Sequence, residues 1–117
     1  MEILAQIDAF FAGRPQEWML FEELKKRVCS AYPTTKLRVM KTCISFDDPK
    51  PYCYVSFPKR KSDEGLLISL GLREAVKHPR IGMLVPVSKT SLTAHILLRS
   101  EKEIDEELLA LLALSRR

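Results

Sequence analysis

KLRVMKTCISF, residues 36–46, marks the point at which the hydrophobic pattern changes from a helical period to a period of two. Leu37 and Val39 alternate with basic residues, which predicts a strand with one buried face. Ile44 and Phe46 then have the opposite parity, and a bulge or tight turn between the two halves would account for this slip. The chain is therefore expected to enter a sheet here.

Two amphipathic helices are predicted before the sheet. The apolar residues of the first helix recur one, three or four positions apart, and they are Ile3, Leu4, Ile7, Phe10 and Phe11. Gly13 suits the end of this helix, and Pro15 fits the first turn of the next one. The apolar face of the second helix consists of Leu20, Phe21, Leu24, Val28 and Ala31. Since Pro33 disfavours a helical residue before it, residues 1–32 are predicted to form a helical hairpin.

Four more strands are predicted after the opening stretch. Residues 47–51 contain two aspartates and two prolines, a composition that is typical of a turn. Aromatic, β-branched or alternating residues then predict strands at 52–57, 66–72, 83–87 and 92–98. With the opening stretch they predict a mostly antiparallel sheet of about five strands within residues 36–99.

A last helix is predicted over residues 101–115. It follows Ser100-Glu101-Lys102-Glu103, which has the sequence of a capping box. The 117 residues are thus expected to form a single α+β domain with an N-terminal helical hairpin, the sheet, and a C-terminal helix packed on the sheet. The expected core consists of Phe10, Phe21, Leu24, Val28, Leu70, Ile96, Leu108 and Leu112.

Composition narrows the class of protein. Hydrophobic residues make up 46% of the chain and charged residues 29%, as in an ordinary globular domain. The acidic Glu2 and Asp8 argue against a signal peptide, and the longest apolar run, residues 108–114, is too short to span a bilayer. A cytoplasmic protein without membrane contact is expected. The three cysteines lack metal-ligand spacing, so we expect reduced thiols, no metal site and no cofactor.

Several short motifs occur in the order in which a known protein family has them. They are LFEELKKRV at residues 20–28, VMKTCISF at 39–46, PYCYVSFP at 51–58, LLISLGLR at 66–73 and TAHILLRSEKEIDEELLALL at 93–112. Together they resemble a bacterial domain of unknown function, family 5655, over about residues 20–114. The resemblance implies an α+β fold, and it brings no established activity, cofactor or catalytic residue.

The sequence offers few residues for catalysis. It contains no phosphate-binding glycine loop, no HExxH and no GxSxG motif. His78 stands before a proline in a basic loop, which is typical of a polar connection. His95 shares a strand face with Thr93 and Arg99, where it either lines a polar groove or is an ordinary surface histidine. A small enzyme with a site at His95 remains an alternative, although no catalytic motif supports it.

A cluster of cations and rings points to binding. The net charge is +4, and residues 25–61 hold ten lysines or arginines against two acids. Cations can neutralise phosphates while aromatic rings stack on bases. The candidate ligand-binding residues are Arg38, Lys41, Phe46, Tyr54, Arg73 and His95, and a separate basic loop holds Lys59, Arg60 and Lys61. The competing interpretation is a set of solvated charges and packed rings, with the basic loop as a turn whose charge the following acids partly cancel.

Two kinds of partner follow from these observations. The leading hypothesis is a non-catalytic binding module for an anionic ligand or nucleic acid on the sheet face. The alternative is a protein-interaction or homodimerisation module, because the last helix has apolar residues on more than one face. These residues are Ile104, Leu108, Leu109, Leu111, Leu112 and Leu114.

Overall fold

The computed structural model describes residues 2–58 and 65–116 and begins with the predicted helical hairpin. Helix α1 spans Glu2–Phe10 and helix α2 spans Pro15–Ala31. Gly13 has a φ of +77° in the turn between them, where a residue without a side chain is least strained. Pro15 occupies the first turn of α2, where a missing backbone N–H is tolerated.

The sheet is fully antiparallel and has six strands rather than about five. The strands are β1 (Lys36–Val39), β2 (Ile44–Asp47), β3 (Pro51–Ser56), β4 (Leu66–Leu72), β5 (Met83–Ser88) and β6 (Ser91–Leu98). Their spatial order is β1-β2-β3-β4-β6-β5. The slip between the halves of the opening stretch is a tight turn, in which the Met40 N–H donates to the Cys43 carbonyl at 2.8 Å. The stretch therefore contributes two strands, which explains the sixth.

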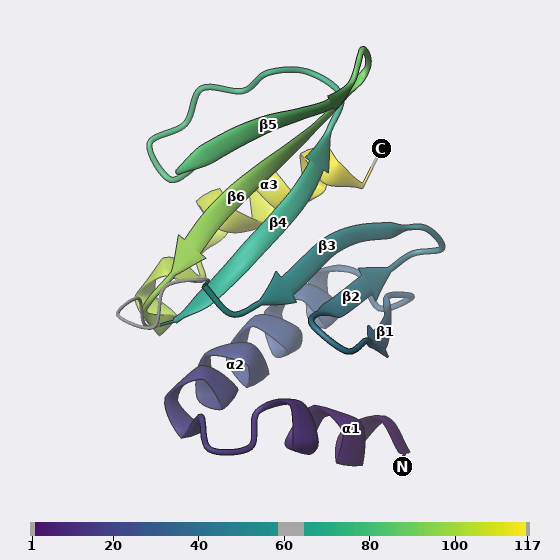
Figure 1. Cartoon of the computed structure of the whole chain (residues 1–117), viewed down its shortest axis with the longest axis vertical. Helices are drawn as coiled ribbons and strands as arrows, with labels where there is room; N and C mark the ends of the chain where they lie inside the picture. Colours follow the sequence, from purple (N-terminus) through teal and green to yellow (C-terminus); the bar gives the residue numbers. More distant parts are fainter. Residues whose placement is uncertain (1, 59–64, 117) are drawn as a thin grey trace.

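The helices cover one face of this sheet. In Figure 1, α2 and α3 (Glu106–Ser115) lie behind the strands, and none of the helices formed by residues 2–58 and 65–116 lies in front of them. Alternate residues of the central strands point back toward the helices and are fully buried, as in Val55, Ile68 and Leu70. The opposite side, which we call the open face, carries the intervening residues.

The core matches the predicted one except at the first helix. Phe21, Leu24, Val28, Leu70, Ile96, Leu108 and Leu112 are buried as expected. Phe10 is only half-buried and stacks on Phe57 with 5.0 Å between the ring centroids, while its neighbour Phe11 is buried. Leu4, expected on the apolar face, is 57% exposed. The short α1 thus buries a narrower stripe than its apolar residues suggested.

The last helical region has a break that the sequence pattern did not predict. The capping box at Ser100 is present, but it starts a short 3₁₀ helix, Glu101–Glu103, and not the α-helix itself. Helix α3 begins afterwards, and the side chain of Asp105 caps it by accepting from the Leu108 N–H at 3.1 Å. Ile104 lies between the two helices and is buried.

An arginine ties the β4–β5 connection to the start of α3. Arg80 donates to both carboxylate oxygens of Asp105, at 2.7 and 2.6 Å, and to the Glu103 carbonyl at 3.0 Å. A bidentate, charge-assisted contact of this kind fixes orientation as well as distance. The long connection is therefore anchored at Arg80 to the helical layer.

A bulge in β3 turns the ring of Tyr52 inward. The register between β2 and β3 shifts after Phe46, and both Tyr52 and Cys53 are buried. The Tyr52 hydroxyl lies 2.7 Å from that of Thr35, and its ring packs against Tyr32 and the Arg116 guanidinium. Tyr52 therefore joins the helices to the sheet and is absent from the open face.

Candidate sheet-face binding site

A single row of side chains crosses the open face from one edge of the sheet toward the other. The strand pairing places Arg38 opposite Ser45, Ser45 opposite Tyr54, Tyr54 opposite Ser69, and Ser69 opposite His95. These five residues, from β1, β2, β3, β4 and β6, are called the polar row. They share one face because directly paired residues in an antiparallel sheet project to the same side.

The β1 end of the polar row is basic. The Arg38 Nε lies 3.2 Å from the Asp47 Oδ2, and Ser45 donates a hydrogen bond to the same carboxylate. Since the Arg38 side chain is 53% exposed, this ion pair is solvent-screened and weak. The contact uses Nε, and the two terminal nitrogens of the guanidinium have no other partner among the described residues.

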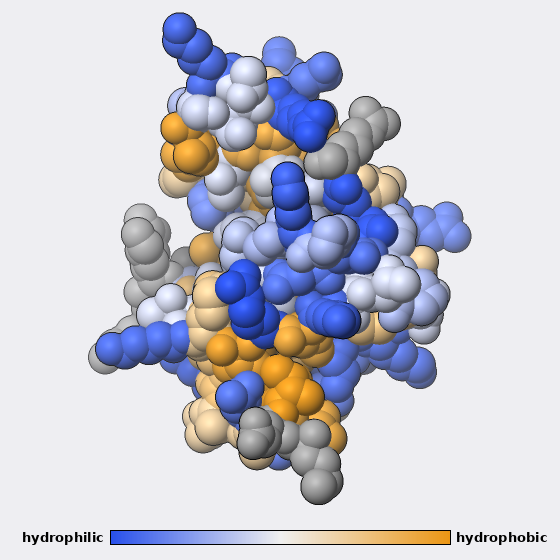
Figure 2. All heavy atoms as spheres, turned by 90° about the vertical axis from the view of Figure 1, so that its right-hand side faces the viewer, coloured by the Kyte–Doolittle hydropathy of each residue, from blue (hydrophilic) through white to orange (hydrophobic). Residues whose placement is uncertain are grey.

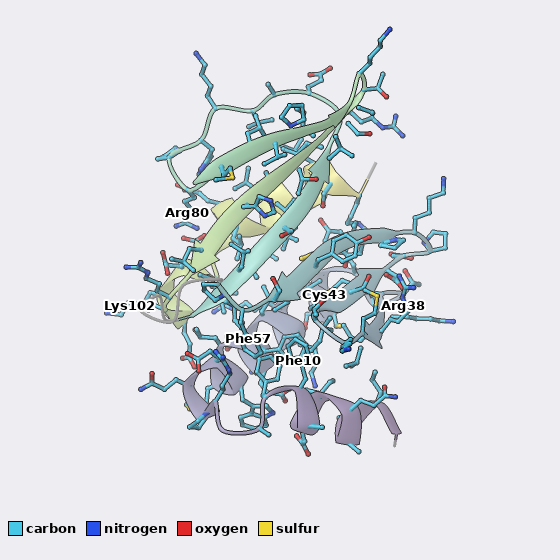
Figure 3. The ribbon with its side chains drawn as sticks, in the orientation of Figure 1. Phe10, Arg38, Cys43, Phe57, Arg80 and Lys102 are labelled. Carbon is cyan, nitrogen blue, oxygen red and sulfur yellow. The ribbon has the colours of Figure 1, made fainter. Side chains whose placement is uncertain are left out.

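Two lysines extend this charge. Lys36 precedes Arg38 by two positions in β1, and Lys41 lies in the β1–β2 turn; both are exposed, and neither has an ion-pair partner in the described part of the chain. We call Lys36, Arg38 and Lys41 the basic edge. Figure 3 shows Arg38 at the β1 edge, on the opposite side of the molecule from Arg80. Figure 2 views the molecule from the β1 side, where hydrophilic side chains cover the middle and hydrophobic ones gather below.

The centre of the polar row combines a ring with small side chains. Tyr54 is 36% exposed in the middle of β3. Its neighbour Ser69 is small, and the next open-face residue along β4 is Gly71, where an added Cβ would meet nothing within 4 Å. The surface beside the Tyr54 ring is therefore small on the Ser69 and Gly71 side, while the half-buried Leu67 borders it on the other side of Ser69.

A hydrogen bond fixes the ring at the far end of the polar row. The Ser69 Oγ lies 2.9 Å from the His95 Nδ1, and the two residues are directly paired across β4 and β6. The hydroxyl can donate to an unprotonated Nδ1 or accept from a protonated one. In either tautomer the contact occupies Nδ1, so Nε2 is the nitrogen left for a ligand.

The structure brings together some of the predicted site residues and separates others. Arg38, Tyr54 and His95 belong to the polar row, and Lys41 lies near its basic end. Arg73 is exposed but directly follows β4 at the opposite end of the strands, so it lies apart from Lys41. Lys59, Arg60 and Lys61 fall outside the described residues.

Phe46 requires a correction. It was expected to offer its ring to a ligand, but it is fully buried on the helix face and meets Phe21 edge-on with 6.0 Å between centroids. Its parity in β2 is opposite to that of Ser45, which takes the open-face position. The turn after β1 resets the alternation, which is why an aromatic next to basic residues in the sequence ends up on the other side of the sheet.

Sequence reasoning missed the serines. Ser45 and Ser69 connect the charged and aromatic members of the polar row, and each makes a side-chain hydrogen bond. A signal existed in the alternation, because both serines interrupt apolar strands at positions with the open-face parity. Ser69 is half-buried there, whereas Ser45 is fully buried beneath its neighbours. Their direct contact with Asp47 and His95 depends on register, which the pattern of one strand does not determine.

Charge is divided between the two layers of the molecule. The strands and connections at residues 36–58 and 65–99 contain nine lysines or arginines and three acids. The helical segments at 3–35 and 100–116 contain nine acids and six lysines or arginines. The strands and their connections are therefore net positive and the helical segments net negative, and this holds even if Arg80, which is paired with Asp105, is counted with the helices. An anion is thus attracted to the sheet layer over the helical one.

The cysteines are not reactive groups of this site. Burial raises the pKa of the Cys53 thiol far above its ordinary value, and burial also raises the pKa of Cys29 and Cys43. Each thiol therefore stays protonated near neutral pH, which makes it a poor nucleophile and a poor metal ligand. Within residues 2–58 and 65–116, no group of histidine, cysteine and acidic side chains has an arrangement that would hold a metal ion.

The apolar residues of the last helix are mostly covered within the chain. Ile104, Leu108, Leu111 and Leu112 are buried and Leu109 is half-buried, which leaves Leu114 at 36% exposure. Intramolecular packing thus accounts for the excess of leucines that suggested a partner. No helix in the part of the chain that the structure describes is long and apolar enough to cross a membrane.

Comparison with known proteins identifies the family and adds no activity to this site. Neither the curated proteins nor the solved structures include a significant match to the chain. The sequence of residues 7–115 matches the family described as a domain of unknown function, DUF5655. This match covers most of the chain and agrees with the resemblance of its strand and helix motifs, so the protein belongs to the DUF5655 family.

Proposed function

We propose that this domain is a non-catalytic binding module that holds an anionic ligand on the open face of its sheet. The observation that carries the proposal is the polar row, in which Arg38, Tyr54, Ser69 and His95 lie on a face that no helix of the described residues covers. Ser45 links Arg38 to Tyr54 within the row but is itself fully buried. Such a face offers hydrogen-bond donors, positive charge and flat apolar surface to one ligand. We place this function in the cytoplasm, as the sequence led us to expect.

The charge division supports an anion over a cation as the ligand. Lys36 is paired across the strands with Asp47 but forms no ion pair with it, and Lys41 forms no ion pair among the described residues, so their charge is available to a ligand. The acids, in contrast, gather on the helical layer, with five between Glu101 and Glu107. An approaching anion meets attraction at the basic edge and repulsion at the start of α3.

The Ser69–His95 contact fits binding better than catalysis. A nucleophilic serine needs donors aimed at the developing oxyanion, and these are usually backbone N–H groups. Both residues lie within strands that have a partner strand on each side, so their backbone groups belong to the ladder. The hydrogen bond is therefore assigned to holding the ring of His95 in place.

Binding can be tested with a dye-labelled oligothymidine of about 12 nucleotides, a length within the range that single small domains cover. We expect a rise in fluorescence anisotropy at low salt and a loss of affinity as salt is added, because phosphate contacts release counterions. Arg38→Ala should lower the slope of log affinity against log salt by about 0.7, the value for one phosphate contact on a single strand.

Arg27→Ala is the matched control for this experiment. Arg27 is 50% exposed and forms an ion pair with Glu23, so it resembles Arg38 in exposure and pairing, but it lies on α2. The control should leave the slope unchanged. Equal effects of the two substitutions, or no binding at the lowest salt concentration, would contradict the proposal.

A further inference from the structure

We infer that the anionic ligand is single-stranded nucleic acid whose bases stack on Tyr54 and His95. This inference rests on the proposed function and specifies its ligand. It depends on two rings that share the open face, on the small residues between them, and on the position of the basic edge at one end of the row. Each of these features restricts the geometry of the ligand.

The spacing of the two rings favours an unstacked strand over a duplex. Tyr54 on β3 and His95 on β6 are separated by one strand, since both pair with Ser69 on β4. Two steps between neighbouring strands span about 9–10 Å. Successive bases in a duplex strand are only about 3.4 Å apart, so two stacked neighbours cannot contact both rings. An extended single strand with splayed bases can.

The small open-face residues between Tyr54 and His95 leave room for a base to lie flat on the sheet. Ser69 separates the rings, and Gly71 and Thr93 form the next pair along β4 and β6. Gly71 is exposed and has open space where a side chain would project. A base on the Tyr54 ring therefore has room over Ser69 and Gly71, and the pair Leu67 and Leu97 on the other side of Ser69 adds apolar surface at its border. Tyrosine and histidine are side chains on which unpaired bases commonly stack.

Ser69 acts as a positioning residue for one of the two stacking rings. Its hydroxyl holds the His95 Nδ1 at 2.9 Å, which restricts rotation of the imidazole and keeps one ring orientation. Met83, directly opposite His95 on β5, is 60% exposed and adds apolar surface beside that ring. This end of the row therefore suits a base better than a phosphate.

The basic edge supplies the complementary contact to the nucleic acid backbone. Arg38 is two strands from Tyr54 on the side opposite His95, because β1 and β2 precede β3 in the sheet. With its phosphates near β1 and its bases over β3 and β6, the nucleic acid would run across the β-strands and not parallel to them. Trp18, 38% exposed on α2, is an exposed ring in a different setting, because it lies on a helix with Glu17 directly before it and Arg14 one turn earlier, and not in a row across the sheet.

The experiment compares three probes of equal length: labelled oligothymidine, an abasic oligonucleotide with the same number of phosphates, and a duplex. We expect the single strand to bind at least about fivefold more tightly than the abasic probe, because stacking on an aromatic ring contributes at that level.

Tyr54→Ala should remove most of this difference in affinity between the single strand and the abasic probe, and Tyr54→Phe should keep it. His95→Ala should reduce the difference, and His95→Phe should restore it. Ser69→Ala should weaken binding in the His95 protein but not in the His95→Ala variant.

Trp18→Ala is the control for loss of an exposed ring, since Trp18 and Tyr54 are exposed to almost the same extent, 38% and 36%. It should leave all three affinities unchanged. If the phenylalanine variants keep or restore the preference for the single strand, the loss in the alanine variants is due to the missing ring and not to unfolding. Equal affinity for the oligothymidine and the abasic probe would overturn the stacking inference and leave the anion-binding proposal intact. Preferential binding of the duplex would also overturn it, and failure of every probe to bind at low salt would overturn both.

Discussion

Arg80 and Asp105 join two segments 25 residues apart in the chain through a pair of hydrogen bonds of 2.7 and 2.6 Å. The Arg80 guanidinium, together with the Leu108 N–H, lowers the pKa of Asp105 to about 2. One carboxylate thus anchors the β4–β5 connection and caps α3. Its ionisation links the stability of both segments to pH.

The first prediction concerns acid stability. An unfolded aspartate has a pKa of about 3.9, so the stability that ionised Asp105 contributes is complete above about pH 4 and is lost as the pH falls toward 2. Asp105→Asn should lower the urea midpoint at neutral pH, and the difference from the wild type should shrink below pH 4. Glu106→Gln, a neighbouring exposed acid in the first turn of α3, serves as the control. A constant difference between pH 7 and pH 2 would contradict the role of this ion pair.

The second prediction concerns a glycine beside β4. Gly65 has a φ of +105°, and a Cβ there would stand 2.2 Å from the Leu98 carbonyl oxygen. Gly65→Ala must therefore shift backbone as well as strain its own conformation, and it should cost more than about 1 kcal/mol in the free energy of unfolding. Gly71→Ala has open space, so its denaturation midpoint should stay close to that of the wild type. Equal denaturation midpoints for the two variants would contradict this prediction, because they would mean that the backbone at residue 65 moves away from the Leu98 carbonyl with little loss of stability.

The third prediction concerns the leucines of α3. Leu112 is fully buried, whereas Leu114 is 36% exposed on the same helix. Leu112→Ala should reduce the free energy of unfolding by about 2–5 kcal/mol, and Leu114→Ala by much less, because only the first leaves a cavity. Sedimentation should show a monomer at micromolar concentrations. A wild-type dimer that Leu114→Lys dissociates would instead support the interaction module that the sequence suggested.

The fourth prediction concerns thiol chemistry. Burial raises the pKa of all three cysteines, most strongly that of Cys53, which is fully buried. Cys29 and Cys43 are half-buried and should react with a thiol reagent more slowly than free cysteine, while Cys53 should react only on unfolding. Mass spectrometry counts the modified thiols. Cys53→Ala should leave the native count unchanged and lower the unfolded count by one.

The order and type of the elements could be predicted from the sequence because each rests on a local signal. The periods of 3.6 and 2, together with Gly13, Pro15 and the capping box at Ser100, fix the order of helices and strands. The strand count was too low because the slip before Ile44 fits both a bulge and a turn. The antiparallel pairing of β1 with β2 and the Met40–Cys43 hydrogen bond identify a turn, and both depend on how the two halves pair.

The candidate site was only partly predictable because it depends on contacts between strands. Arg38, Tyr54 and His95 stood out by residue type, but their alignment follows from four separate registers. Phe46 was placed with the basic residues by proximity in sequence, whereas burial of its ring determines its side of the sheet. The contact between Arg80 and Asp105 has no sequence signal, since the two residues are distant and belong to different elements.

The strand order has a consequence for the kinetics of folding. Strand β4 pairs with β3 across a short connection, but its other neighbour is β6, which follows β5 in the chain. The β4–β6 ladder aligns seven residue pairs, and it forms only after a loop that contains β5 has closed. Contacts between distant segments must offset the entropy of that closure, which slows their formation. We therefore expect the β1–β3 meander to form early and the arrival of β6 beside β4 to limit the rate. The face that presents Ser69 and His95 together is then completed last.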